Sequence, residues 1–254
     1  HSRAVRSGSG GIRFCKNRTR NLTKPSMSLF SSLVYWKDNT PKTGVENMAA
    51  DQILLETNTG KPILRCYQWL HPTVSFGYFL PLADAQAAYP STPNNELDYV
   101  RRWTGGGIVD HRYDLTYTLA IPRSHPLAAS RGAESYQRIH QLLAAALLEL
   151  GADAQLITAD SQQGGNTCFI NPVAYDIVDH TGKKIAGAGQ RRTRHGLLHQ
   201  GSVQADVSLS DLGEKLSSLL ADKIALYEPS ANFSETARSL AEQRYASHAW
   251  LHKK

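Results

Sequence analysis

The chain has 254 residues, of which 41% are hydrophobic and 20% are charged, a composition typical of a soluble globular protein with a sizeable core. No apolar run approaches the roughly 20 residues that span a bilayer, so we expect no membrane segment. The net charge of +6 does not indicate nucleic-acid binding, because the basic excess lies near the N-terminus without interleaved aromatic residues.

The first 26 residues carry seven basic residues and no acidic one, and they lack apolar periodicity. We expect residues 1–26 to be a disordered basic tail, an artefact of the assigned start site or a transit-like segment, with Met27 as a natural start. Three cysteines and ten scattered histidines show no metal-ligand spacing, so neither a metal site nor a disulfide framework is expected. This cysteine usage favours a reducing, cytoplasmic location.

Periodicity and turn signals predict the elements along the remaining chain. Helices are expected at 44–57, 134–150, 210–221 and 234–246, and strands at 62–69, 73–77, 97–103, 107–111, 115–121, 153–158, 174–179, 183–187 and 197–205. Hairpin strands with helices between their groups predict an α+β fold with a central mixed, largely antiparallel sheet and flanking helices.

Residues 101–111, RRWTGGGIVDH, form the first informative motif. Three consecutive glycines let the backbone approach a ligand and point N–H groups at one anion, and the two arginines add forked donors. A glycine-rich hairpin turn beside an arginine-rich strand edge explains the pattern about equally well. The candidate binding residues are Arg101, Arg102, Thr104, Gly105, Gly106, Gly107 and His111.

Residues 182–192, GKKIAGAGQRR, form the second motif. A lysine enters a short apolar strand whose small residues, Ala186 and Gly187, leave room for a ligand. The alternative is an ordinary hairpin with a solvated lysine pair. Because neighbouring strand residues point to opposite faces, we expect Lys184 to point inward and Lys183 to face solvent.

Together the two motifs resemble the biotin/lipoate protein ligase family, on its lipoate side. Weaker matches lie at 46–51, 75–78 and near the chain's end, so the resemblance covers roughly residues 30–250. It implies that residues 27–254 form a lipoate ligase/octanoyltransferase-like catalytic domain with the fold predicted above. It also implies transfer of an octanoyl or lipoyl chain to a lysine of a carrier, either the lipoyl domain of a 2-oxoacid dehydrogenase or the glycine cleavage H protein.

Cys168 distinguishes the branches of this family. Octanoyltransferases take the chain from octanoyl-acyl carrier protein and hold it on a cysteine, and the pair Cys168-Phe169, upstream of Lys184, resembles one such branch. The resemblance thus implies Cys168 and Lys184 as catalytic residues, with no tightly bound cofactor. Three alternatives remain: a small buried Cys168, an ATP-dependent ligase that uses free lipoate, ATP and Mg²⁺ through lipoyl-adenylate, and a non-catalytic acyl-binding relative.

Two further residues each have two possible roles. His111 either satisfies a strand hydrogen bond or orients the glycine loop, and Asp176 either holds Lys184 or caps a strand. The paired arginines are candidates for binding a phosphate of ATP or of the carrier's pantetheine. Gln200 departs from the histidine that many relatives have, which can shift substrate choice without removing the reaction.

Overall fold

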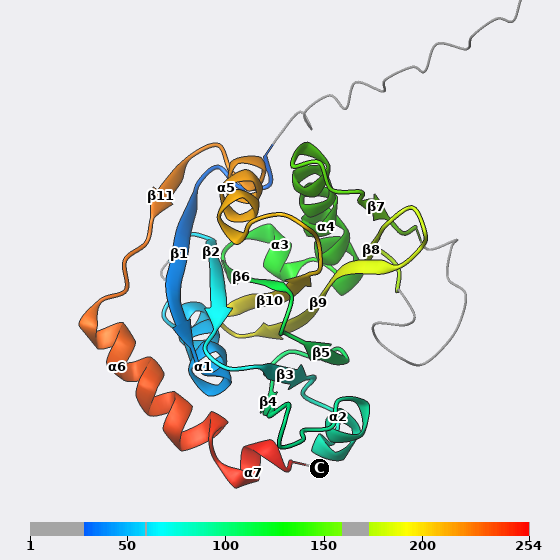
Figure 1. Cartoon of the computed structure of the whole chain (residues 1–254). Helices are drawn as coiled ribbons and strands as arrows, with labels where there is room; N and C mark the ends of the chain where they lie inside the picture. Colours follow the sequence, from blue (N-terminus) through cyan, green and yellow to red (C-terminus); the bar gives the residue numbers. More distant parts are fainter. Residues whose placement is uncertain (1–27, 59, 159–172, 254) are drawn as a thin grey trace, which may run out of the picture.

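The computed structural model describes residues 28–58, 60–158 and 173–253 (Figure 1). An eight-stranded sheet with the order β11-β1-β2-β6-β10-β9-β8-β7 forms its centre. Two of its strand pairs are parallel, β11-β1 and β1-β2, and the other pairs are antiparallel. The predicted mixed, largely antiparallel sheet is confirmed.

The strands of this sheet are β1 (Leu33–Lys42), β2 (Ile63–Trp69), β6 (Leu115–Pro122), β7 (Gln155–Leu156), β8 (Ile177–Val178), β9 (Lys184–Thr193), β10 (Gly196–Val203) and β11 (Ile224–Leu226). A smaller sheet has the order β4 (Asp98–Arg101), β3 (Thr73–Phe76), β5 (Ile108–Asp110). The helices are α1 (Gly44–Glu56), α2 (Leu82–Ala88), α3 (Pro126–Ala129), α4 (Gly132–Glu149), α5 (Leu209–Leu220), α6 (Ala231–Leu240) and α7 (His248–Leu251), with a π-helical turn (Ala241–Tyr245) after α6.

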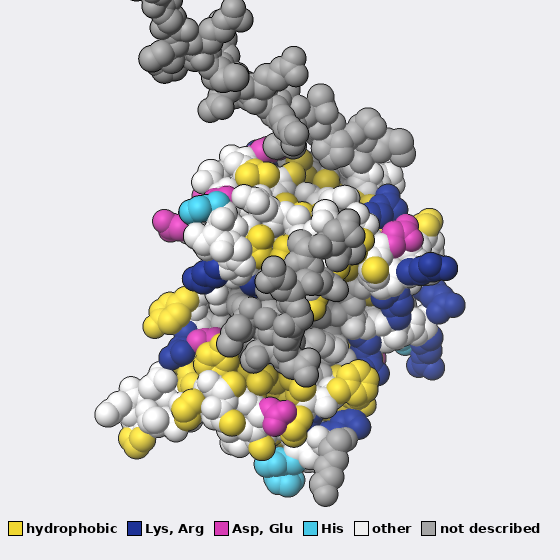
Figure 2. Space-filling view, turned by 90° about the vertical axis from the view of Figure 1, so that its right-hand side faces the viewer, with side chains coloured by type: hydrophobic (Ala, Val, Ile, Leu, Met, Phe, Trp, Pro, Cys, Tyr) yellow, Lys and Arg dark blue, Asp and Glu magenta, His cyan; other side chains and the backbone are white. Residues whose placement is uncertain are grey.

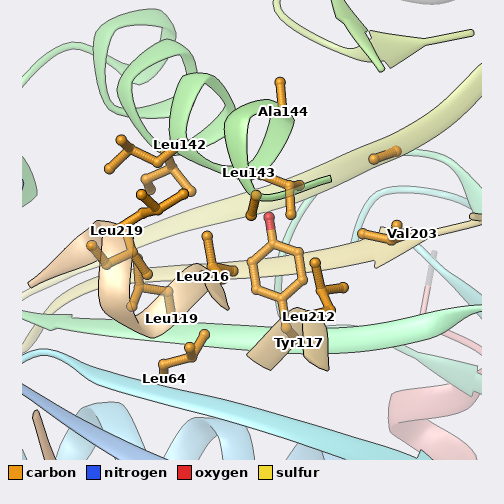
Figure 3. Packing of buried hydrophobic residues seen from close by; sticks show 14 of the residues in the cluster. Leu64, Tyr117, Leu119, Leu142, Leu143, Ala144, Val203, Leu212, Leu216 and Leu219 are labelled. Atoms are coloured by element: carbon orange, nitrogen blue, oxygen red, sulfur yellow. The ribbon is translucent and has the colours of Figure 1, made fainter. Parts of the chain in front are cut away.

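One face of the large sheet is covered by α3, α4 and α5 (Figure 1). Leucines on α4 and α5 pack there against strand residues such as Leu64, Leu119 and Tyr117 (Figure 3). The opposite face is covered by α1, against which α6 and the π-helical turn pack. The small sheet and α2 lie beyond the end of this layer, so the loops between the two sheets come close to β9 and β10.

The predicted elements at all four helical ranges are present, whereas β1, β11, α2, α3 and α7 were not predicted. The sequence did not predict β1, because the charged residue Asp38 interrupts its apolar pattern. In the structure Asp38 is nevertheless buried. The prediction for residues 1–26 concerns residues outside the described part of the chain. Within the described ranges, no helix combines the length and apolar character required to cross a bilayer.

Candidate functional site

A cavity of about 160 Å³ lies where β9 and β10 face the glycine loop, residues 104–107. Its walls are mainly apolar, with a few polar groups at separate points. The apolar and backbone lining comes from Met48, Tyr67, Trp69, Ile108, Val109, Val173, Gly106, Gly107, Gly187 and Gly189, and the polar lining includes Ser75, Arg102, Tyr136, Lys184, His111 and Gln200. The structure therefore brings the two sequence motifs together around one hollow.

Glycine is required where the two motifs touch. A Cβ atom on Gly189 of β9 would lie 2.4 Å from the carbonyl oxygen of Gly105 and 2.8 Å from Oγ1 of Thr104. Gly106 adopts a φ of +97°, a region that side chains disfavour. The loop can thus lie directly on β9, and both glycine-rich segments contribute backbone to the cavity.

Arg101 does not line the cavity. Its side chain is buried, and its guanidinium donates hydrogen bonds to five backbone carbonyls, those of Tyr78, Leu80, Trp250, Leu251 and Lys253. The side chain therefore holds the C-terminal segment against the small sheet, and its N–H groups are occupied by protein rather than by a ligand.

Arg102, in contrast, lines the cavity, and its side chain also binds the glycine loop. Its guanidinium donates to the carbonyl oxygen of Gly107 at 2.7 Å and to Oγ of Ser75 at 2.7 Å. Because one rigid fork binds both groups, Arg102 ties the glycine loop to β3.

His111 is the centre of a chain of hydrogen bonds that starts at Arg102. Its Nε2 lies 2.6 Å from Oγ of Ser75, and its Nδ1 lies 2.7 Å from Oδ2 of Asp114. The imidazole stacks on Trp69 with ring centroids 4.1 Å apart. The carboxylate of Asp114 can only accept here, so the proton sits on Nδ1 and leaves Nε2 to accept from Ser75.

Thr104 connects the loop to a buried polar network. Its Oγ1 donates to Gln200, whose amide donates in turn to Oδ2 of Asp51 at 2.7 Å. The other oxygen of Asp51 accepts from Arg65, which also binds Asp38. Sequence reasoning missed this network, because its charged members lie 14 to 27 positions apart and show no local pattern.

Lys184 points inward and Lys183 is exposed, as the strand alternation predicted. Nζ of Lys184 lies 2.8 Å from Oδ2 of Asp176, which is fully buried. Asp176 also accepts from the hydroxyl of Tyr136 at 2.5 Å. Of the two readings for Asp176, the structure supports the one in which it holds Lys184.

Gly187 makes room for that lysine. A Cβ atom at this position would lie 2.5 Å from Cε and 2.6 Å from Nζ of Lys184. The side chain of Lys184 therefore folds over the backbone of its own strand, and Gly187 lines the cavity beside it. Ala186 is buried and pairs with Ile177 of β8, away from the cavity.

Two buried histidines lie near the Lys184–Asp176 pair. Nδ1 of His140 donates to the carbonyl oxygen of Tyr175, and its ring packs on Tyr136 at 4.0 Å between centroids. Burial lowers the pKa of His140 to about 4 and lowers that of His199 as well. Both rings are therefore neutral at pH 7 and, among the described residues, add no positive charge to that of Lys184 beside Asp176.

Of the two cysteines beyond the N-terminal tail, the structure describes one. Cys66 is buried on β2 and burial raises its pKa to about 12, which makes it a core residue rather than a nucleophile. The candidate Cys168 lies outside the described residues. Val173, the first described residue after it, lines the cavity and donates its N–H to Asp176.

The face turned toward the viewer in Figure 2 carries an uneven distribution of side chains. Lysines and arginines gather along one edge, and hydrophobic side chains lie over the lower part. Exposed Phe79 and Tyr113, at 83% and 85% exposure, follow β3 and β5, the strands of the small sheet that border the cavity.

Comparison with known proteins gives a consistent result. The lipoyl protein ligase A/B catalytic domain family matches residues 43–246. The octanoyltransferase LipM of Oceanobacillus iheyensis is 34% identical over 179 residues, which are 69% of this chain and 65% of that protein. The octanoyltransferase LipM of Moorella thermoacetica is 37% identical over 175 residues, 65% of this chain and 63% of that protein. The match thus spans slightly less than two thirds of the length of these relatives.

Solved structures with the same fold are more distant in sequence. A lipoate-protein ligase A bound with ATP is 20% identical with a TM-score of 0.69, covering 87% of this chain and 98% of that one. A bipartite lipoate protein ligase from Thermoplasma acidophilum is 20% identical with a TM-score of 0.63, covering 88% of this chain and 98% of that one. These likenesses show the predicted fold.

Proposed function

The chain belongs to the lipoyl protein ligase A/B catalytic domain family, and on that premise we propose that it transfers an octanoyl or lipoyl chain to one lysine of a lipoyl carrier domain. The observation that carries this proposal is the cavity between the two motifs, an apolar hollow with a lysine–carboxylate pair at its wall. Relatives named octanoyltransferase, at 34% and 37% identity, support the transferase reading.

The cavity suits an unbranched acyl chain ending in a polarised carbonyl. Met48, Ile108 and Val109 offer apolar surface for the methylene groups. Lys184 supplies a positive charge near the carbonyl, where negative charge develops as a nucleophile adds. Asp176 fixes the direction of that charge, since its buried carboxylate holds the ammonium at 2.8 Å.

For the donor we propose octanoyl-acyl carrier protein, with the chain held transiently as a thioester on Cys168. A thiolate exchanges readily with thioesters, and Cys168 precedes the cavity-lining Val173 by five positions in the sequence. We propose that the reaction runs in the cytoplasm, where the thiol stays reduced. The proposed acceptors are the lipoyl domain of a 2-oxoacid dehydrogenase and the glycine cleavage H protein.

The experiment offers purified protein two donors in separate reactions with an acceptor lipoyl domain. We expect an octanoyl mass increment on the acceptor with octanoyl-acyl carrier protein alone, without ATP. Omitting the acceptor should leave that increment on the peptide containing Cys168, and Cys168→Ala should abolish it. Modification only with free lipoate, ATP and Mg²⁺ would identify an adenylating ligase instead, and no modification in either reaction would identify a non-catalytic acyl-binding relative.

A further inference from the structure

Exposed arginines gather at the end of the large sheet where β9 turns into β10. They come from the turn after β6, the N-terminal part of α4 and the β9–β10 hairpin. All are exposed, and together we call them the arginine patch: Arg123, Arg131, Arg138, Arg192 and Arg194. Three segments that lie far apart in the sequence thus contribute to one basic surface.

Hydrogen bonds hold these segments together. The guanidinium of Arg192 donates to Oγ of Ser135 on α4 at 2.7 Å. The backbone N–H of Arg123 donates to the carbonyl oxygen of His195 at 2.9 Å, which joins the turn after β6 to the β9–β10 hairpin. The patch is therefore built on regular elements with fixed positions.

The rest of the domain is not basic. Residues 1–26 hold seven of the 28 lysines and arginines and none of the 22 acidic residues, so residues 27–254 hold 21 basic and 22 acidic residues. Residues 206–242 carry seven acidic and three basic residues. Within the described ranges, Glu134 is the only carboxylate in an ion pair with the patch, at 4.0 Å from Arg138 with both side chains half exposed. Such a pair contributes little, so the patch keeps its positive charge.

The patch borders the cavity without forming its wall. Gly189 of β9 lines the cavity, and Arg192 follows it by three positions, roughly 10 Å along a strand. On α4, Ser135 binds Arg192, and the next residue, Tyr136, lines the cavity. A molecule seated on the patch therefore lies beside the cavity.

The residue type indicates the chemistry of the partner. All five cations are guanidinium groups, whose forked donors match carboxylates and phosphates better than an ammonium does. Residues 123–135 and 190–196 contain no Phe, Tyr or Trp, on which the bases of a nucleic acid would stack. The patch fits an acidic protein surface.

We propose that the arginine patch docks the acidic face of the protein that carries the acyl donor. This assignment rests on the proposed acyl transfer and names the surface that recognises its donor. A domain on the patch is separated from the cavity by roughly 10 Å of β9. The four-carbon stem of an acceptor lysine is too short to span that gap, whereas an acyl chain on a long prosthetic arm reaches across it.

Salt should weaken this docking in the wild type. The Debye length falls from about 10 Å at 0.1 M to about 3 Å at 1 M ionic strength, so the attraction between exposed charges is lost. We expect kcat/KM for octanoyl-acyl carrier protein to fall steeply with added NaCl, and kcat/KM for octanoyl-pantetheine, which is uncharged and has no protein part, to change little.

The test compares these two donors in a double variant, Arg123→Glu with Arg194→Glu. Reversing two charges should lower kcat/KM for octanoyl-acyl carrier protein by about 10- to 10²-fold, because electrostatic steering is lost. The reaction with octanoyl-pantetheine should stay near that of the wild type. Arg238→Glu, which reverses an exposed arginine on α6, is the matched control and should change neither donor, and a thermal melt checks that each variant is folded.

Binding without turnover completes the test. The Kd of the carrier protein, measured without an acceptor, should rise in the double variant by a similar factor. An unchanged Kd, equal losses with both donors, or a loss that appears in KM for the lipoyl domain instead would overturn the docking assignment. A wild type that transfers from neither donor would overturn the proposed function, and the Kd values would then decide the patch by themselves.

Discussion

Two buried cation–carboxylate clusters on the large sheet differ in how far protein atoms enclose the cation. Arg65 is fully buried under α1, and its five N–H groups bind Asp38, Asp51 and the backbone and side chain of Asn47. Lys184 is also mostly buried, yet it lines the cavity, and within the described part of the chain it forms a salt bridge with the carboxylate of Asp176. The first cluster is closed by protein atoms, whereas the second borders the cavity.

The type of cation distinguishes an ion pair that only stabilises the fold from one that can also face a cavity. A planar guanidinium with fixed donors can be satisfied completely by its neighbours, so it specifies packing. An ammonium on a flexible stem can be aimed by one carboxylate and still face a cavity. The closed cluster is joined to the glycine loop through Gln200 and Thr104, so it also supports one wall of the cavity that Lys184 lines.

The largest expected effect comes from opening the closed cluster. Arg65→Ala leaves the buried carboxylate of Asp51 without its counter-charge and leaves Asp38 with the half-buried Lys42 alone, so it should lower the free energy of unfolding by about 3–5 kcal/mol. Urea denaturation at pH 7 measures this loss. A loss below about 1 kcal/mol would show that water can replace the guanidinium. The Arg65 cluster would then be accessible to solvent, as the Lys184–Asp176 pair is, and the contrast between the two would fail.

Lys184→Ala should act on rate more than on stability. Removing a donor at a developing oxyanion costs on the order of 10²- to 10³-fold in rate. The stability loss should be clearly smaller than for Arg65→Ala, because Asp176 keeps two donors, Tyr136 and the N–H of Val173. Acyl transfer to a lipoyl domain, alongside a thermal melt, measures both, with the exposed Lys183→Ala as control; near-normal transfer by Lys184→Ala would refute the assignment.

Acid should lower the stability of the fold through His140, which packs on Tyr136 beside the Lys184–Asp176 pair. Burial lowers the pKa of His140 from 6.5 to about 4, so the unfolded chain binds a proton there before the folded one does. Stability is therefore fully present above pH 6.5 and falls as the pH drops toward 4, by up to about 3 kcal/mol from this residue. His140→Gln should flatten the dependence between pH 6.5 and 4 in urea titrations, and an unchanged slope would place the effect elsewhere.

The smallest expected effect concerns the helix that carries Asn47 and Asp51. Thr43 caps α1 in a reciprocal capping box with Glu46, so Thr43→Ala should cost about 1 kcal/mol of unfolding free energy. Transfer activity should not change, since the cap lies outside the cavity. Thr40→Ala, an exposed change on β1, is the control. Equal losses of unfolding free energy in both variants would show that the cap does not cause the effect of Thr43→Ala.

The sequence was sufficient for the parts of the fold with strong local signals. The periodicity of residues 134–150 predicted α4 as a helix, and the alternation at the start of β9 placed Lys184 inward and Lys183 outward. The two glycine motifs, some 80 positions apart, predicted one shared site because they resembled one family, and the structure brings them together at the cavity.

The remaining parts depend on contacts that no local pattern encodes. Arg65 meets Asp38 across 27 positions, and β1 is recognisable as a strand only once β2 and β11 lie beside it. Arg101 and Arg102 are adjacent and chemically identical, so the sequence could not show that one binds the C-terminal segment and the other the glycine loop.

The bonds of Arg101 also bear on the order of events during protein synthesis. Three of its acceptors, in Trp250, Leu251 and Lys253, leave the ribosome about 150 residues after the arginine itself. Until they emerge, a nascent chain would have to bury a guanidinium without these partners, which costs several kcal/mol. We therefore expect β4, the strand that leads into the glycine loop, to reach its final position last, so that the wall of the cavity is complete only after the C-terminal segment has been synthesised.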